Sequence, residues 1–206
     1  MILGRWLLQA RVQLRRQVRR RRLRSAARMG HSLRVAIGEE GKSPPGWLIS
    51  DLPELDALKP GDWAFIFQPH SISHLLLEHV VEHWTTQQMG VFLDIARDYL
   101  TRDGRIRIAV PDGNHPDPAY IEAVRPGGSG PGAEDHKMLY VSDTFEEVAR
   151  AHHYTVELLE RFDASHQFHA MPWSTEDGFI ERSAQFDPRN TERLVYTSLL
   201  ADLRPS

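Results

Sequence analysis

Short apolar runs bounded by glycine, proline or charged residues recur along the chain, and such runs are typical of buried β-strands. They predict strands at residues 33–38, 46–51, 63–67, 73–77, 105–110, 154–162 and 194–203. Apolar residues at helical spacing predict a helix over 85–100, and a shorter helix is predicted over 144–152 with Thr144 as its N-cap. Strands that alternate with helices indicate an α/β fold with a largely parallel sheet and helices on its faces.

The N-terminal segment, residues 1–30, differs in pattern from the single domain predicted over 31–206. Residues 1–34 contain eleven arginines and no acidic residue, whereas acidic residues predominate in the rest of the chain. The apolar residues of the segment recur every three or four positions, at Leu3, Leu7, Ala10, Leu14 and Val18. This spacing predicts a basic amphipathic helix.

Several interpretations of this basic segment stay open. In one interpretation, the segment packs in part on the domain. In another, residues 2–24 lie on an anionic membrane, with Trp6 and the leucines inserted and the arginines at the headgroups. Nucleic-acid binding is disfavoured because the domain itself is acidic. An Arg-rich, acid-free segment also fits an organellar transit peptide, whereas a secretory signal fits poorly. We expect a cytoplasmic protein, peripheral on the inner face of the membrane.

Composition narrows the possible chemistry. The chain has no cysteine, which excludes disulfides, thiolate-bound zinc or iron–sulfur clusters, and a thiol nucleophile. No stretch approaches the roughly 20 apolar residues that span a bilayer. Residues 113–137 are rich in glycine and proline and directly follow the clearest strand, at 105–110. They predict either a lid over a site at the carboxyl ends of the strands or a flexible connector.

A glycine turn follows the first predicted strand, in Ile37-Gly38-Glu39-Glu40-Gly41, and Asp51 ends the second strand. Glycines at such a turn let the backbone approach a cofactor, and an acid at the next strand end accepts hydrogen bonds from a ribose. Only thirteen residues separate Gly38 from Asp51, fewer than the usual ~20. The pattern alone therefore leaves a plain connection as an open alternative.

A histidine-rich stretch, His79-Val-Val-Glu82-His83, matches the inverted zincin motif, in which two imidazoles lie one helical turn apart with a glutamate beside them. The alternative is a strand end that turns into a helix with polar residues at the sheet edge. Single ionisable residues in loops are further candidates for a general base, although most such residues are merely solvated: Asp112, His115, Asp135, His136, His166 and His169. The sequence has no Gly-x-Ser-x-Gly elbow and no Walker-type phosphate loop.

The order of these motifs resembles a class I S-adenosylmethionine-dependent methyltransferase, and in particular a group of small bacterial predicted methyltransferases. The resemblance covers about residues 33 to 205. Its N-terminal part is carried by Ile37-Gly38, Gly46-Trp47, Asp51, residues 78–83, Tyr99-Leu100 and residues 103–113. Its more specific C-terminal part is carried by residues 115–120, 135–137, 159–163, 168–169, 177–178, 182–183, 187–190 and 196–199.

The resemblance implies a Rossmann-like sheet of seven strands, in which residues 194–203 form one antiparallel strand beside 154–162. It also implies S-adenosyl-L-methionine as cofactor. Gly38 and Glu39 would approach its methionine part, Asp51 would hold the ribose hydroxyls, and Glu78 and His79 would flank the methyl donor. The implied cofactor-binding set is Ile37, Gly38, Glu39, Gly41, Asp51, Glu78 and His79.

The leading hypothesis is methyl transfer to an oxygen or nitrogen nucleophile of an acceptor that enters beneath residues 113–137. His79, Asp112 or His115 would remove a proton, and this hypothesis needs no metal ligand. Cell-surface glycan assembly is the setting that the resemblance suggests for the acceptor. A non-catalytic Rossmann-like scaffold, recruited by its basic segment, is the alternative from another class. A metal hydrolase that uses His79 and His83 is the third.

Overall fold

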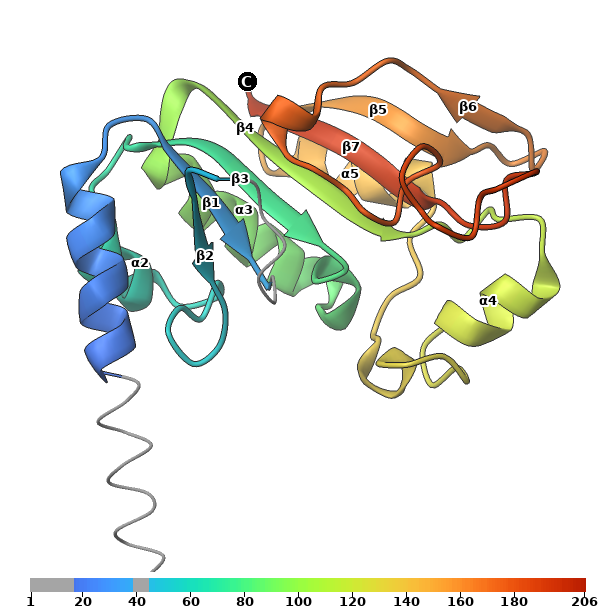
Figure 1. The fold of residues 1–206 in the computed structure, drawn as a ribbon, viewed down its shortest axis with the longest axis horizontal. Coiled ribbons are helices and arrows are strands. Elements are labelled where there is room, and N and C mark those ends of the chain that lie inside the picture. Colours follow the sequence, from blue (N-terminus) through green and yellow to red (C-terminus); the bar gives the residue numbers. More distant parts are fainter. Residues whose placement is uncertain (1–16, 39–44) are drawn as a thin grey trace, which may run out of the picture.

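The computed structural model describes residues 17–38 and 45–206 and shows an α/β fold built on one mixed sheet (Figure 1). Its seven strands follow the order β2-β1-β3-β4-β7-β5-β6. They are β1 (Leu33–Ile37), β2 (Trp47–Ser50), β3 (Ile72–Glu78), β4 (Leu100–Pro111), β5 (Tyr154–Phe162), β6 (Phe168–Ala170) and β7 (Ser198–Pro205). The predicted α/β class and the seven-stranded Rossmann-like sheet are therefore confirmed.

The strand directions place the carboxyl ends of β1, β2, β3 and β4 at one edge, because these four strands are parallel. β7 is inserted antiparallel between β4 and β5, which confirms the predicted antiparallel strand beside 154–162. β6 pairs antiparallel with β5 at the edge of the sheet and was not predicted. It pairs over three positions only, so the sequence carries little pattern for it.

The prediction of a strand at 63–67 was wrong, because these residues belong largely to helix α2 (Pro60–Ile66). Pro60 is suited to a first helical turn, where no N–H donor is needed. Trp63, Ile66 and Phe67 are buried, a spacing of three and four that belongs to a helix. The Trp63 indole also donates a hydrogen bond to the Ala57 carbonyl at 3.1 Å, which anchors the helix to the preceding loop.

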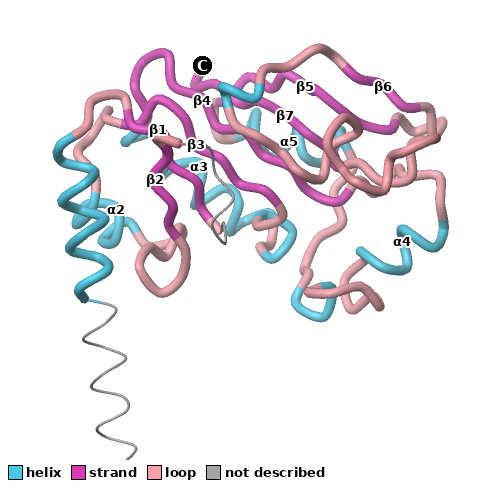
Figure 2. The backbone as a smooth tube through the Cα atoms, in the orientation of Figure 1, coloured by secondary structure: helices cyan, strands magenta, loops and turns pink. Residues whose placement is uncertain are grey.

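Two further helices follow the predicted periodicity, and Figure 2 shows them beside the strands. Helix α3 (Thr86–Tyr99) begins at a capping box in which Thr85 and Gln88 bond each other's backbone. Helix α5 (Ser142–Ala151) begins two residues before Thr144, so that residue is not its N-cap. β4 starts at Leu100, before the strand predicted at 105–110, and runs through Gly104.

The two faces of the sheet are covered differently. Alternate strand residues such as Val35, Leu75 and Ile108 pack with α2, α3 and α5 in the larger core. On the opposite face, Ala36, Leu76, Ala109 and Leu200 meet Ile180 and Trp173, from an irregular segment. In the described part of the chain, residues 171–197 cover this face, which differs from the expected helices on both faces. We call residues 171–197 the covering segment.

A buried ion pair fixes the covering segment to the sheet. Arg107 of β4 and Asp202 of β7 face each other in register and make two hydrogen bonds of 2.7 and 2.8 Å. The same guanidinium donates to the carbonyls of Ser174, at 2.7 Å, and Gly178, at 2.8 Å. Its face lies 5.0 Å from the centroid of the Trp173 ring.

The N-terminal helix, described over residues 17–29, docks at the β2 side of the sheet next to α2 (Figure 1). Arg20 pairs with Asp62 at 2.8 Å, and the guanidinium groups of Arg20 and Arg24 lie over the Phe65 ring. Part of the basic segment therefore packs on the domain. Residues 3–14 lie outside the described residues. Within residues 17–38 and 45–206, no helix combines the length and apolarity needed to cross a membrane.

Candidate functional site

A pocket of about 320 Å³ lies at the carboxyl ends of β1, β2 and β3. We call it the glycine pocket, because Gly38 forms part of its wall. It combines apolar side chains with two acids and two imidazoles. Its lining residues are Ile37, Gly38, Asp51, Leu52, Leu55, Asp56, Ala57, His79, Val80, His83 and Trp84. Four residues predicted to bind the cofactor are thus brought together: Ile37, Gly38, Asp51 and His79.

Gly38 has a backbone conformation and a close neighbour that explain why glycine stands there. Its φ angle is +80°, in the left-handed region, and its N–H donates to the Ser50 carbonyl at 2.9 Å. A Cβ at this position would collide with Cγ2 of Val80. Asp51 is exposed at the rim, where its carboxylate accepts a hydrogen bond from the N–H of Leu52 at 2.6 Å. Glu39 and Gly41 lie outside the described residues.

A second pocket, of about 420 Å³, adjoins the first. We call it the histidine pocket. The segment predicted as a lid, 113–137, contributes one wall, and Figure 1 shows its helix α4 (Pro118–Val124) beyond the carboxyl end of β4. The covering segment also lines the pocket, through Arg182, Arg189 and Tyr196. The full lining is His79, Glu82, His83, Pro111, Ala123, Val124, Gly130, Pro131, Gly132, His136, Arg182, Arg189 and Tyr196.

His79 and His83 line both pockets, so they form the boundary between them. His79 has a φ angle of +54°, and its ring is held on both sides. Nδ1 lies 3.0 Å from Oε1 of Glu82, and Nε2 lies 3.0 Å from the Ser198 hydroxyl. Because that hydroxyl donates to the Arg182 carbonyl at 2.7 Å, it accepts from the imidazole. Nε2 of His79 is therefore the donor in this contact, and the role of His79 as a general base stays a prediction.

Glu82 is the carboxylate behind this boundary, and its side chain is fully buried. Burial by itself would raise the pKa of Glu82. The attraction and hydrogen bonding of His79, with a smaller contribution from His136, outweigh burial and lower that pKa. The carboxylate is thus held in its charged form between these imidazoles.

The inverted zincin pair does not form. Its geometry needs the two histidines one turn apart on an α-helix. Instead, Val81–His83 is a single 3-10 turn, η1, and His79 precedes it in a left-handed conformation. Both ring nitrogens of His79 are already occupied by Glu82 and Ser198. The hypothesis of a metal hydrolase on His79 and His83 therefore lacks its ligand pair.

Two of the predicted bases have structural roles away from both pockets. Asp112 is fully buried, and its carboxylate accepts hydrogen bonds from the backbone N–H groups of Phe162, at 2.6 Å, and Asn114, at 2.9 Å. Burial raises the pKa of Asp112, and the backbone bonds oppose that shift. His115 stacks on Tyr120 with ring centroids 3.9 Å apart, and burial lowers its pKa.

Glu78 was predicted to flank the methyl donor, but it lines neither pocket. Its carboxylate accepts hydrogen bonds from the backbone N–H groups of Glu181, at 3.2 Å, and Arg182, at 2.7 Å. Glu78 therefore fixes the covering segment where that segment enters the histidine pocket.

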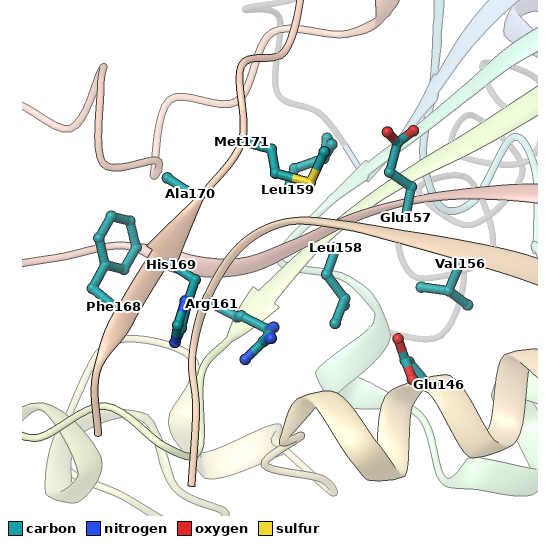
Figure 3. A pocket seen from close by; sticks show the side chains of 10 residues that line it. All are labelled: Glu146, Val156, Glu157, Leu158, Leu159, Arg161, Phe168, His169, Ala170 and Met171. Carbon is teal, nitrogen blue, oxygen red and sulfur yellow. The ribbon is translucent and has the colours of Figure 1, made fainter. Parts of the chain in front are cut away.

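A larger groove, of about 690 Å³, lies at the other end of the sheet around β5 and β6 (Figure 3). It is lined from both faces of β5: Val156 and Leu158 belong to the face of the larger core, and Leu159 belongs to the opposite face. Figure 3 shows His169 and Arg161 near each other, with Glu146 of α5 at a distance from them. Because the groove wraps around a strand, its polar side chains do not point toward one common ligand position, and we assign no site there.

Sequence reasoning named His136 only as one of several loop residues that could act as a general base, and it assigned no role to Arg189 or Tyr196. In the structure all three lie in loops, including Tyr196, which falls within the strand predicted at 194–203 but precedes β7. Their meeting therefore depends on tertiary contacts. Arg189 lies 3.6 Å over the Tyr196 ring and pairs with the Asp187 carboxylate at 2.5 Å. The available signal was that these residues belong to the C-terminal motifs that carry the family resemblance.

The strand order, with β7 antiparallel between β4 and β5, defines a Rossmann-like mixed sheet. Solved structures of S-adenosylmethionine-dependent methyltransferases match it at low sequence identity. One, from Archaeoglobus fulgidus, is 13% identical with a TM-score of 0.45, and the match covers 91% of this chain and 92% of that one.

A second is the Burkholderia thailandensis 1,6-didemethyltoxoflavin-N1-methyltransferase with bound 1,6-didemethyltoxoflavin and S-adenosylhomocysteine. It is 12% identical with a TM-score of 0.45, and the match covers 91% of this chain and 78% of that one. A third is the LepI complex with SAM, which is 12% identical with a TM-score of 0.45. The match covers 92% of this chain but only 41% of LepI. Protein-family models and curated protein sequences gave no match.

Proposed function

We propose that the chain is an S-adenosyl-L-methionine-dependent methyltransferase that acts on an oxygen or nitrogen nucleophile. The methyl donor would bind in the glycine pocket and the acceptor in the histidine pocket. The observation that carries this proposal is that the two pockets share His79 and His83. Two ligands bound there would meet at these imidazoles, which is what direct transfer between them requires.

The glycine pocket has features that suit the proposed donor. Gly38 lines the pocket through its backbone alone, because the space of a side chain there is taken by Val80. Asp51 presents a carboxylate at the end of β2, where it would accept hydrogen bonds from the two ribose hydroxyls. Leu55, Val80 and Trp84 add an apolar surface for an adenine ring.

The donor, when bound, supplies a methyl group on a positively charged sulfur. The part of the protein is then to align the acceptor nucleophile with that methyl group and to exclude water. Residues 123–136 and the covering segment enclose the acceptor side of the histidine pocket. His79 would act there as a positioning residue, held by Glu82 and Ser198.

The side chains of the histidine pocket favour an acceptor that carries negative charge or several oxygen atoms. Arg182, Arg189 and three imidazoles line the pocket, and Glu82 is the acid among its lining residues. Arg182 and Arg189 suit carboxylate or phosphate oxygens. A precursor of a cell-surface glycan fits this chemistry, and we propose that setting on the strength of the sequence resemblance.

Calorimetric titration of the full chain with S-adenosylmethionine and S-adenosylhomocysteine tests the proposal. We expect binding that weakens about 10- to 100-fold in Asp51→Asn, because hydrogen bonds to a charged group contribute about 1.5–3 kcal/mol. Glu54→Gln is the matched control: it removes a nearby carboxylate that does not line the glycine pocket, and it should bind normally.

If neither ligand binds to the folded protein, the methyltransferase proposal fails, and the result favours the alternative of a non-catalytic scaffold. If both ligands bind and Asp51→Asn binds as the parent does, the donor is not in the glycine pocket. Binding with the expected loss justifies a search for methylated acceptors among anionic sugars.

A further inference from the structure

One group of side chains in the histidine pocket is not explained by methyl transfer. Glu82, His83 and His136 present carboxylate oxygen and imidazole nitrogen atoms that all lie within 4.8 Å of one another. Glu82 and His83 are neighbours on the η1 turn. His136 joins them because the backbone N–H groups of Lys137 and Met138 both donate to the Glu82 carbonyl, at 2.8 and 3.1 Å.

The hydrogen bonding of His136 defines which of its nitrogens faces Glu82. Nδ1 lies 2.7 Å from the Val124 carbonyl oxygen, which can only accept, so Nδ1 carries a proton. Nε2 then faces Oε1 of Glu82, 4.0 Å away. Two such atoms stay close when a positive charge lies between them, which is either a proton on Nε2 or a metal ion bound by both. A bond from one imidazole nitrogen to a backbone carbonyl is also the usual outer contact of a metal-bound histidine.

A second observation on this group of side chains concerns the carboxylate of Glu82. Its side chain has no exposed surface, and Oε1 lies 3.0 Å from Nδ1 of His79. Oε2 has no hydrogen-bond partner within the described residues. A buried carboxylate with free lone pairs is costly unless something binds it. The His83 ring completes the group: it meets the His136 ring edge-on, with centroids 4.8 Å apart.

We propose that Glu82, His83 and His136 bind one divalent transition-metal ion of the zinc class. Two imidazoles and one carboxylate are the ligand set of several three-ligand zinc sites, and such a site keeps a further position open. Ligand atoms around tetrahedral zinc lie about 3.3 Å apart, so side-chain rotations of about 1 Å would close this group on an ion. His79 would be a partner of the ligand Glu82 and not itself a ligand.

The open position would face the histidine pocket, next to Arg182 and Arg189. The group that completes the coordination is therefore an anionic oxygen. This one step rests on the proposed function: in that reaction, the oxygen belongs to the acceptor. A bound metal favours the deprotonated form of a hydroxyl group. Metal binding itself needs no methyl donor and stands apart from the proposed function.

The test is a titration of the full chain with Zn²⁺ after treatment with a chelator and dialysis, followed by calorimetry, without a methyl donor. Titration with Co²⁺ gives a second readout, the visible absorption of the bound ion. We expect one ion per chain. In His136→Gln and in His83→Gln, we expect affinity to fall by at least about 100-fold, because even outer-shell partners are worth 10- to 100-fold. His169→Gln removes an imidazole outside the group and should bind as the parent does.

Glu82→Gln is the riskier variant because the side chain is buried, so its fold is checked by circular dichroism. His83 is only partly buried, which keeps the test decisive if Glu82→Gln fails to fold. The inference would be overturned if the parent chain bound no metal ion. It would also be overturned if the His83→Gln and His136→Gln variants bound the ion as tightly as the parent chain. A charged His136 paired with Glu82 would then explain the group. Donor titration of the metal-free chain separates this failure from a failure of the proposed function.

Discussion

The buried Arg107–Asp202 pair gives a prediction whose magnitude follows from the structure. Arg107 is 1% exposed and Asp202 is 3% exposed, and the guanidinium makes four hydrogen bonds. Arg107→Met keeps a similar length of chain but leaves the Asp202 carboxylate with Arg105, 3.6 Å away, as its remaining charged partner. It also leaves the carbonyls of Ser174 and Gly178 without these donors.

Removing one partner of a buried ion pair costs about 3–5 kcal/mol, because the other charge is left uncompensated. We expect Arg107→Met to lower the free energy of unfolding by this amount. Replacing both partners, as Arg107→Met with Asp202→Leu, should recover a large part of the loss, because no buried charge remains. Arg105→Met is the control: Arg105 is 21% exposed and its contacts are mainly with Asp177, so the expected loss is about 1 kcal/mol.

Equilibrium unfolding in urea measures these differences. A second readout is limited proteolysis: the covering segment, residues 171–197, should become the first site of cleavage in Arg107→Met, because the pair anchors it. A loss below about 1.5 kcal/mol would refute the reasoning. So would a double variant that is no more stable than Arg107→Met.

Two more predictions concern the glycine turn and the basic segment. Gly38→Ala should lower the free energy of unfolding by about 1–2 kcal/mol, because the φ of +80° suits glycine, and it should also weaken donor binding. Adding Val80→Ala should restore only the part of the lost stability that is due to the collision with Val80. Unfolding curves measure the stability, and calorimetry measures the binding. Trp6→Ser with Leu7→Ser should reduce co-sedimentation of the full chain with anionic vesicles, and equal binding by both chains would argue against membrane docking through residues 2–24.

Several elements could be predicted because their signal is local. Residues 154–162 form β5 with the predicted bounds, and residues 105–110 lie inside β4, since a bounded apolar run suits a buried strand. Helix α3 follows from its 3.6-residue period, and the capping box at Thr85 fixes its start. The turn at Gly38 and the acid at Asp51 could also be predicted, because each marks the end of a strand and a parallel sheet brings these ends to one edge.

Other features depended on contacts between distant residues. The run at 63–67 is as apolar as a strand, but its buried residues meet the core as a helix, and a short apolar run does not distinguish the two. His79 and His83 look like a zincin pair, but a 3-10 turn and the contacts of Glu82 and Ser198 separate their roles.

The sequence by itself determined the α/β class, the positions of the longer strands and helices, and the place of the glycine turn, because hydrophobic period and turn residues act within a few positions. Tertiary structure decided which loops meet. It brought His136 to Glu82 across 54 positions, placed Arg182 and Arg189 in one pocket with residues of the 123–136 segment, and buried Asp112 as an acceptor of backbone hydrogen bonds. Those outcomes depend on hydrogen bonds and burial between segments far apart in the chain, for which no local pattern exists.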